Sequence, residues 1–169
     1  FSRREAAVTL LEVRAGNPPS AVEMLLRYNR IHGLDRLTEL WAEWEKWFAE
    51  VQESHTSLAA LVFFRSPDPD NSWVSASAAV LDAASLLLAA VDRPSDPQAA
   101  LCIRAGYLAL RSIADFYRIP YNPDPHYPDE PLSLTRAQFD EACRQLAGGG
   151  ISLVADLDEA WTNLSLIHI

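Results

Sequence analysis

The feature of this sequence that most restricts its fold is a set of bulky aromatic residues that recur every three or four positions. Trp41, Trp44, Trp47 and Phe48 share this spacing, and aliphatic residues continue it over residues 37–61. Because an α-helix has about 3.6 residues per turn, this spacing places the apolar side chains on one face of a helix. Acidic residues occupy the opposite face. We predict a long amphipathic helix that begins near residue 34.

The aromatic face of this helix has two interpretations. Packing in a core is the commoner role for tryptophan residues at helical spacing. Each indole N–H also needs an acceptor or water, so part of the face could lie at the edge of the bundle. Trp41, Trp44, Trp47 and Phe48 are therefore also a candidate interface, and a flat exposed patch of these residues would favour a docking role.

Helix start and stop signals divide the rest of the chain into further helices. Capping boxes begin at Ser2 and Thr135, and Asp96 followed by proline marks another start. No run alternates with the period of two that a strand requires, so we predict an all-α bundle of six to seven helices with a proline-rich loop over residues 119–134. The other expected helices cover residues 2–15, 18–32 (ended by Gly33), 73–91 (capped by Asn71 or Ser72), 98–118, 135 to the glycines at 148–150, and a last segment from Asp156 that holds Trp161.

Length, composition and charge set limits on domains and partners. About half of the 169 residues are hydrophobic (49%), so residues 2–164 can form one domain with a sizeable core. We expect this domain to belong to a longer protein, and the apolar residues 165–169 to be a non-native tail. The formal net charge of −9 argues against nucleic acid as a partner, since phosphates would be repelled.

The apolar segment over residues 73–91 is about long enough to cross a membrane. Asp82 lies near its middle, and a carboxylate there costs roughly 2.5 to 3.5 kcal/mol on insertion scales. Alanine and serine around it cannot offset that cost. We therefore predict a helix buried inside a bundle, with no membrane insertion by this segment.

Two charged residues, Asp82 and Arg104, lie inside the apolar helices on either side of residues 92–97. If these helices form an antiparallel hairpin, both residues reach a similar depth, and we predict an ion pair that fixes the register. Asp82→Ala should then lower stability sharply. A ligand site between the two helices is the alternative interpretation.

Catalytic, cofactor and metal sites are not predicted. Gln52 stands where a Glu-x-x-His half-site of a di-metal bundle would need glutamate before His55, and a second half-site is absent from the sequence. The sequence has no G-x-S-x-G elbow, and its glycine cluster at 148–150 follows a helix instead of opening one. Cys102 and Cys143 lack the spacing of metal ligands and read as small core residues.

Several segments together resemble the long helical tail of bacterial potassium-channel-like proteins, in which a short pore with two transmembrane helices precedes such a tail. The similarity covers roughly residues 2–161. It is carried by ESHTSLAALVFFRSP (53–67), SWVSASAAVLDAASL (72–86), LCIRAGYLALRSIADFYRIPY (101–121), SLTRAQFDEACRQL (133–146) and DEAW (158–161).

The resemblance implies a non-catalytic cytosolic accessory domain that is tethered to the inner membrane in its parent protein and assembles or gates a pore. Its partners would be the rest of the parent chain and further copies of itself. No Thr-Val-Gly-Tyr-Gly filter motif occurs in this sequence, so no pore residue can be assigned, and the ion and gating signal stay open. A ligand-binding bundle or enzyme with a site near Asp82 and Arg104 is one alternative function, and a docking scaffold that uses the Trp41–Phe48 face is the other.

Overall fold

The computed structural model describes residues 2–57, 73–124 and 134–167. These ranges form seven α-helices, one short 3-10 helix and no strand beyond a single bridging residue pair. The predicted all-α bundle is therefore confirmed. The helices are α1 (Ser2–Ala15), α2 (Ala21–Arg30), η1 (Leu34–Arg36), α3 (Leu37–Ser57), α4 (Trp73–Ala89), α5 (Pro97–Phe116), α6 (Arg136–Gly148) and α7 (Leu157–Ile167).

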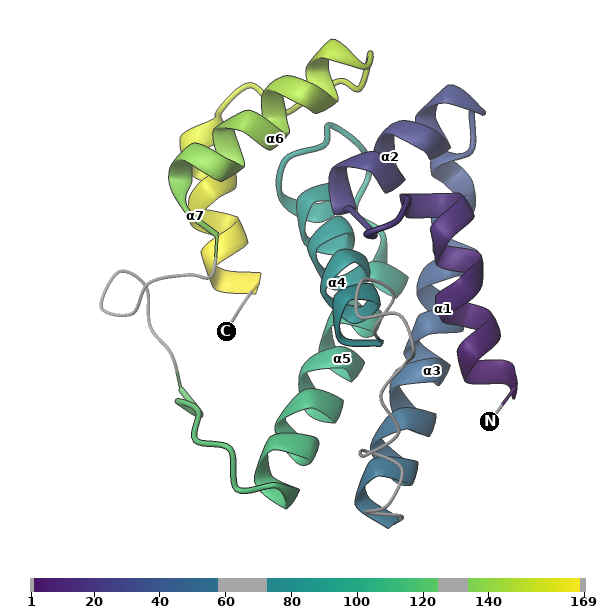
Figure 1. Ribbon diagram of the computed structural model, residues 1–169. Helices are drawn as coiled ribbons and strands as arrows, with labels where there is room; N and C mark the ends of the chain where they lie inside the picture. Colours follow the sequence, from purple (N-terminus) through teal and green to yellow (C-terminus); the bar gives the residue numbers. More distant parts are fainter. Residues whose placement is uncertain (1, 58–72, 125–133, 168–169) are drawn as a thin grey trace.

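Helices α3 and α5 form the most extensive helix pair, and they run in the same direction (Figure 1). Near their starts, Thr38 Oγ1 donates a hydrogen bond of 2.7 Å to Asp96 Oδ2. Further along both helices, Phe48 faces Gly106, where an added Cβ would lie 3.2 Å from Phe48 Cε2. The aromatic face of α3 thus packs onto α5.

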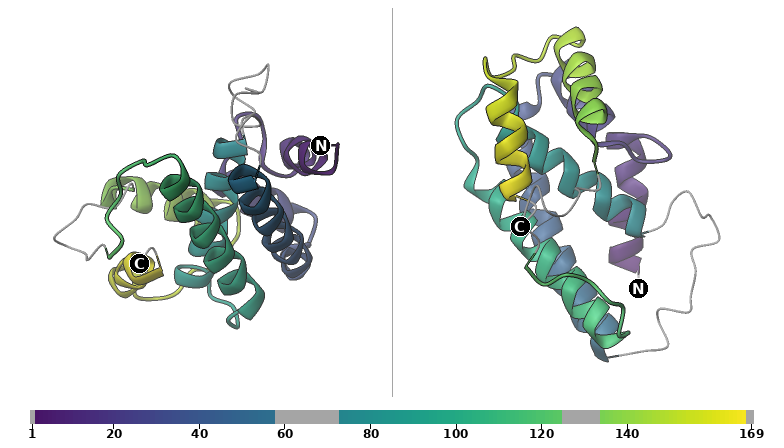
Figure 2. Two further views of the ribbon diagram at one scale, coloured as in Figure 1. Left: turned by 90° about the horizontal axis from the view of Figure 1, so that it is seen from below. Right: turned by 90° about the vertical axis from the view of Figure 1, so that its left-hand side faces the viewer.

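Helix α4 lies in the middle of the molecule, with α6 and α7 on one side and α1 on the other (Figures 1 and 2). Eleven of its seventeen residues are buried, which confirms the predicted buried helix. Among the described residues, no helix has both the length and the apolarity needed to cross a membrane. The apolar character of α4 comes from neighbouring helices that cover it on most sides.

Helices α4 and α5 approach each other closely at Leu81 and Gly106. A Cβ added to Gly106 would lie 2.5 Å from Leu81 Cδ2 and 3.1 Å from its Cδ1. A larger residue at this position would therefore require the end of the Leu81 side chain to move. The contact lies at about the position along the two helices where Asp82 and Arg104 were expected to meet.

The ends of α2 differ from the predicted ones. The helix begins at Ala21 instead of near Pro18, because Ser20 is the N-cap, and the Ser20 hydroxyl accepts a hydrogen bond of 3.3 Å from the amide of Glu23. At the other end, the left-handed residue is His32 (φ 53°), whereas Gly33 has φ −107°. The Gly33 amide donates to the Tyr28 carbonyl at 2.7 Å, which completes a Schellman motif one residue earlier than expected.

Helices α4 and α5 end at Ala89 and Phe116, two residues earlier than predicted, and Ser2 lies within α1, whereas the starts of α5 and α6 agree with the sequence signals. Asp96 caps α5, and Thr135 forms a capping box with Gln138 at the start of α6. Gly150, with φ 88°, follows the end of α6. The expected cap at Asn71 or Ser72 and the inward-facing Leu58 and Leu61 lie outside the described residues.

The connection between α4 and α5 is joined to the connection between α6 and α7. Val91 and Leu153 form an antiparallel bridge. The Asp92 amide donates to the Ser152 carbonyl, and the Val154 amide donates to the Ala90 carbonyl, both at 2.9 Å.

Residues 165–167, which we expected to lie outside the domain, continue α7, and Ile167 packs against the core.

Candidate functional site

The four aromatic residues proposed as an interface lie in the core. The exposed fractions of Trp41, Trp44, Trp47 and Phe48 are 0%, 1%, 5% and 1%. Core packing, the commoner of the two interpretations, is therefore confirmed, and these four residues form no exposed docking face. Helix α5 packs against Phe48, whereas Arg4 of α1 and Trp73 of α4 lie against Trp47. Trp47 Nε1 donates to the Arg4 carbonyl at 3.2 Å, whereas the buried Trp41 Nε1 has no acceptor among the described residues.

The predicted ion pair between Asp82 and Arg104 is absent from the described part of the chain, where Arg104 is exposed and no salt bridge joins it to Asp82. The physical reason is rotation about the helix axis. Leu81 is the residue of α4 that faces Gly106 on α5. Its neighbour in sequence points about 100° away, which directs Asp82 away from this contact.

Asp82 instead opens into a groove between α2, α4, α6 and α7. The groove has a volume of about 440 Å³, and aliphatic side chains form much of its wall. Four elements that are distant in sequence contribute to it. The lining residues are Ser20, Ala21, Val22, Asp82, Leu86, Leu134, Ala137, Gln138, Glu141, Ala142, Gln145 and Leu164.

Two carboxylates line this groove, and they differ in their surroundings. Glu141 forms an ion pair of 2.5 Å with Arg144 and accepts a hydrogen bond of 3.1 Å from Gln145 Nε2. Asp82 has neither kind of partner among the described residues. Loss of hydration beside the apolar wall raises the pKa of Asp82 to about 6. Asp82 is nevertheless an exposed residue, so its carboxyl group is accessible to a ligand and is only partly shielded from water by the apolar wall.

Tyr107, on α5, is affected by the charge of Asp82. Burial raises the pKa of Tyr107 to about 12, the Asp82 carboxylate adds to that effect, and the Arg111 guanidinium opposes it. Tyr107 thus stays neutral over the physiological range. A neutral phenol adds no charge of either sign beside Asp82.

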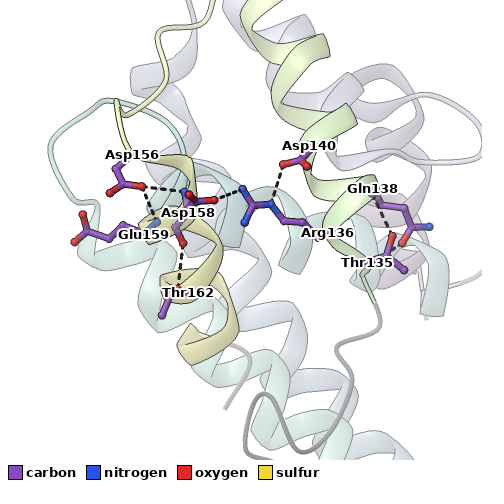
Figure 3. A network of polar contacts seen from close by, with 8 residues as sticks. All are labelled: Thr135, Arg136, Gln138, Asp140, Asp156, Asp158, Glu159 and Thr162. Atoms are coloured by element: carbon purple, nitrogen blue, oxygen red, sulfur yellow. Dashed lines mark hydrogen bonds and ion pairs between the residues drawn. The ribbon is translucent and has the colours of Figure 1, made fainter.

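A polar network holds together α6 and α7, which contribute to one side of the groove (Figure 3). Arg136 Nε contacts Asp140 Oδ1 at 2.9 Å on its own helix, and Arg136 Nη2 contacts Asp158 Oδ1 at 2.6 Å on α7. The same guanidinium lies over the rings of Phe139 and Trp161, 5.8 and 5.9 Å from their centroids. We interpret Arg136 as a structural clamp, since its charge is already paired twice.

Metal ligands do not cluster in the described residues. Those residues contain no cluster of three or more His, Cys, Asp or Glu side chains that could hold a metal ion. The side chain of His55 lies outside the described part, which leaves the prediction about a half-site there untested. Cys102 and Cys143 are both buried, as predicted for core residues.

The comparisons identify no relative of this chain: no protein-family model, no curated protein and no solved structure matches it. The resemblance to tails of channel-like proteins therefore gains no support from them. The groove includes Asp82 but not Arg104, which we had considered together as a ligand site. The other walls could not be predicted, because they combine residues from separate helices. The one usable signal was the unexplained charge of Asp82 in an apolar helix.

Proposed function

We propose that this chain is a non-catalytic binding domain that holds a small organic ligand in the groove beside Asp82. One observation carries the proposal: a carboxylate without a protein partner among the described residues opens into a largely aliphatic groove of about 440 Å³. Small-molecule sites typically have volumes of roughly 300 to 1,000 Å³ and few polar groups on apolar walls. The groove fits both criteria.

A binding role suits this groove better than catalysis does. General acid–base chemistry needs a proton donor and acceptor placed around one reacting atom, and covalent catalysis needs an activated nucleophile. Among the lining residues, Glu141 is occupied by Arg144 and Gln145. The Ser20 hydroxyl already accepts a bond as the cap of α2. Asp82 is left as a single anchoring charge.

The test uses a neutral apolar probe, so that it examines the groove without assuming the charge of the ligand. We expect phenethyl alcohol, titrated into the isotopically labelled chain, to shift the amide resonances of Val22, Leu86 and Ala142 together and saturably. Ala142→Phe would fill the groove and should abolish these shifts while the circular dichroism spectrum stays helical. Shifts that are absent, or that survive in Ala142→Phe, would remove the proposal.

The accessory role in a channel-like parent protein is a separate proposal that rests on the resemblance alone. It includes the tether to the inner membrane and assembly with further copies. A ligand-binding groove would suit a domain that regulates a pore. Sequencing the gene upstream of this chain tests the idea: two apolar spans around a filter motif would support it, and their absence would remove it.

A further inference from the structure

We infer that the groove selects a hydrophobic amine, meaning a small ligand with an apolar body and one protonated amino group for which Asp82 is the counter-ion. The inference rests on the proposed function and adds the chemical class of the ligand. It comes from the distribution of charge and apolar surface in the groove.

The charges in the groove favour a cation. The described lining side chains include two carboxylates and no lysine, arginine or histidine. Arg144 and Gln145 satisfy Glu141, so Asp82 presents the open negative charge. The net charge of −9 adds a long-range attraction for cations and repels anionic ligands. An acidic ligand would thus meet repulsion at every stage of binding.

The apolar walls favour an organic cation over a metal ion. Val22, Leu86, Leu134 and Leu164 offer surface that can cover the body of a ligand and displace water from it. Displacing that water also lowers the local dielectric constant, which strengthens an ion pair at Asp82. A divalent metal ion would need several oxygen ligands, and no suitable cluster exists among the described residues.

The protonation state of Asp82 makes binding dependent on pH. With the pKa of Asp82 raised to about 6, the counter-ion is present above that value and disappears below it. Glu141 on α6 and Tyr107 on α5 supply no positive charge, and the Arg111 guanidinium, which acts on Tyr107, is not among the causes of the pKa shift of Asp82. The described lining residues of α2 and α7 are not titratable. The preference for an amine should therefore weaken as pH falls through about 6.

The experiment compares phenethylamine with phenethyl alcohol, which have the same shape, by isothermal titration calorimetry of the full 169-residue chain. At pH 7.5 we expect the amine to bind about tenfold more tightly, the size of effect that one charged hydrogen bond gives. Asp82→Asn should remove this preference and leave the alcohol affinity unchanged. Asp92→Asn is the matched control, because it deletes the same charge from an exposed residue outside the groove.

Each outcome bears on one of the two proposals. Equal affinities for amine and alcohol in the unmodified chain, or a preference that persists in Asp82→Asn, would overturn the amine inference. In that case, shifts of the groove amide resonances on titration with phenethyl alcohol would still support the proposed binding function. If Asp82→Asn does not fold, Asp82→Ser provides a smaller neutral replacement. A preference that stays constant from pH 7.5 to pH 4.5 would also overturn the inference.

Discussion

At the scale of single residues, Asp82 carries a free-energy cost that a neutral residue of similar size would avoid. Asp82 is exposed, but the apolar wall removes part of the hydration of its carboxylate, and no protein group among the described residues compensates for that partial loss. Local costs of this kind often occur at functional sites, where a ligand supplies the missing interaction. The cost itself is measurable without any ligand.

We predict that Asp82→Asn raises the free energy of unfolding at pH 7.5 by about 1 kcal/mol, a value reduced for the solvent access of the side chain. The folded-state pKa of about 6 lies above the ordinary aspartate value of 3.8. Protonation therefore stabilises the fold, and the stabilisation is lost as pH rises through about 6. This reverses the loss of stability expected for an ion-paired Asp82.

Urea denaturation at several pH values checks this prediction. The difference between Asp82→Asn and the unmodified chain should be largest above pH 7 and should vanish near pH 4. Asp92→Asn, which lies in the α4–α5 connection, should show no such pH-dependent gain. A destabilised Asp82→Asn at pH 7.5 would mean that the carboxylate has a partner outside the described residues.

The sequence predicted the depth of Asp82 in the bundle but not its direction. Counting residues from the turn between the helices placed Asp82 opposite Arg104, and the contact of Leu81 with Gly106 lies close to that level. Depth changes by about 1.5 Å per residue, whereas direction changes by about 100°. An error of one residue in the register therefore changes the depth of a side chain very little, but it turns the side chain away from its expected partner.

At the scale of secondary structure elements, helix ends followed local chemistry closely. The capping box at Thr135 and the cap at Asp96 appear as predicted, because each depends on residues within one helical turn. The end of α2 departs from prediction because His32 takes the left-handed position that glycine usually fills. Gly33 follows it in a confined space, because a Cβ added to Gly33 would lie 3.3 Å from Tyr28 Cδ1.

We predict that His32→Gly stabilises the protein by about 0.5 to 1 kcal/mol. A residue with a Cβ is strained at positive φ, and glycine relieves that strain at the end of a helix. Thermal unfolding followed by circular dichroism measures the change. Arg118, which has φ 55° after α5, provides a matched site, and Arg118→Gly should show a gain of similar size. A lower melting temperature in both variants would contradict the argument.

The shape of the groove could not be predicted from the individual helices. Each of its helices was predicted, yet a groove depends on which face of one helix meets which face of another. For α3, three tryptophans define the inward face clearly, and the structure buries them. For α4, nearly every face is apolar, so Asp82 is the single residue whose chemistry marks the side that faces the groove.

At the scale of the whole molecule, the described helices form a main body around α3, α4 and α5 and a smaller pair, α6 and α7, beside it (Figure 2). Phe139 and Trp161 pack together within the smaller pair, with ring centroids 5.3 Å apart. The groove lies where this pair meets α2 and α4. Its apolar gap leaves the pair with fewer stabilising contacts than the main body has.

We predict that Cys143, in α6, reacts with a thiol reagent at lower urea concentrations than Cys102, in α5. Both thiols are buried, and burial raises the pKa of each, to about 12 for Cys102, so neither should react in the native state. Local opening of the smaller pair would expose Cys143 first. Single cysteine variants, Cys102→Ala and Cys143→Ala, allow each rate to be measured separately, and identical urea dependences would show one cooperative unit.

The parallel pairing of α3 and α5 also determines when the aromatic side chains are covered during synthesis. Parallel helices cannot be joined by a tight turn, and α3 ends at Ser57 whereas α5 runs from Pro97 to Phe116. At about 5 to 20 residues per second, a ribosome needs several seconds to add that length. The emerging chain should therefore be most prone to aggregation, and most dependent on chaperones, between the appearance of Ser57 and that of Phe116.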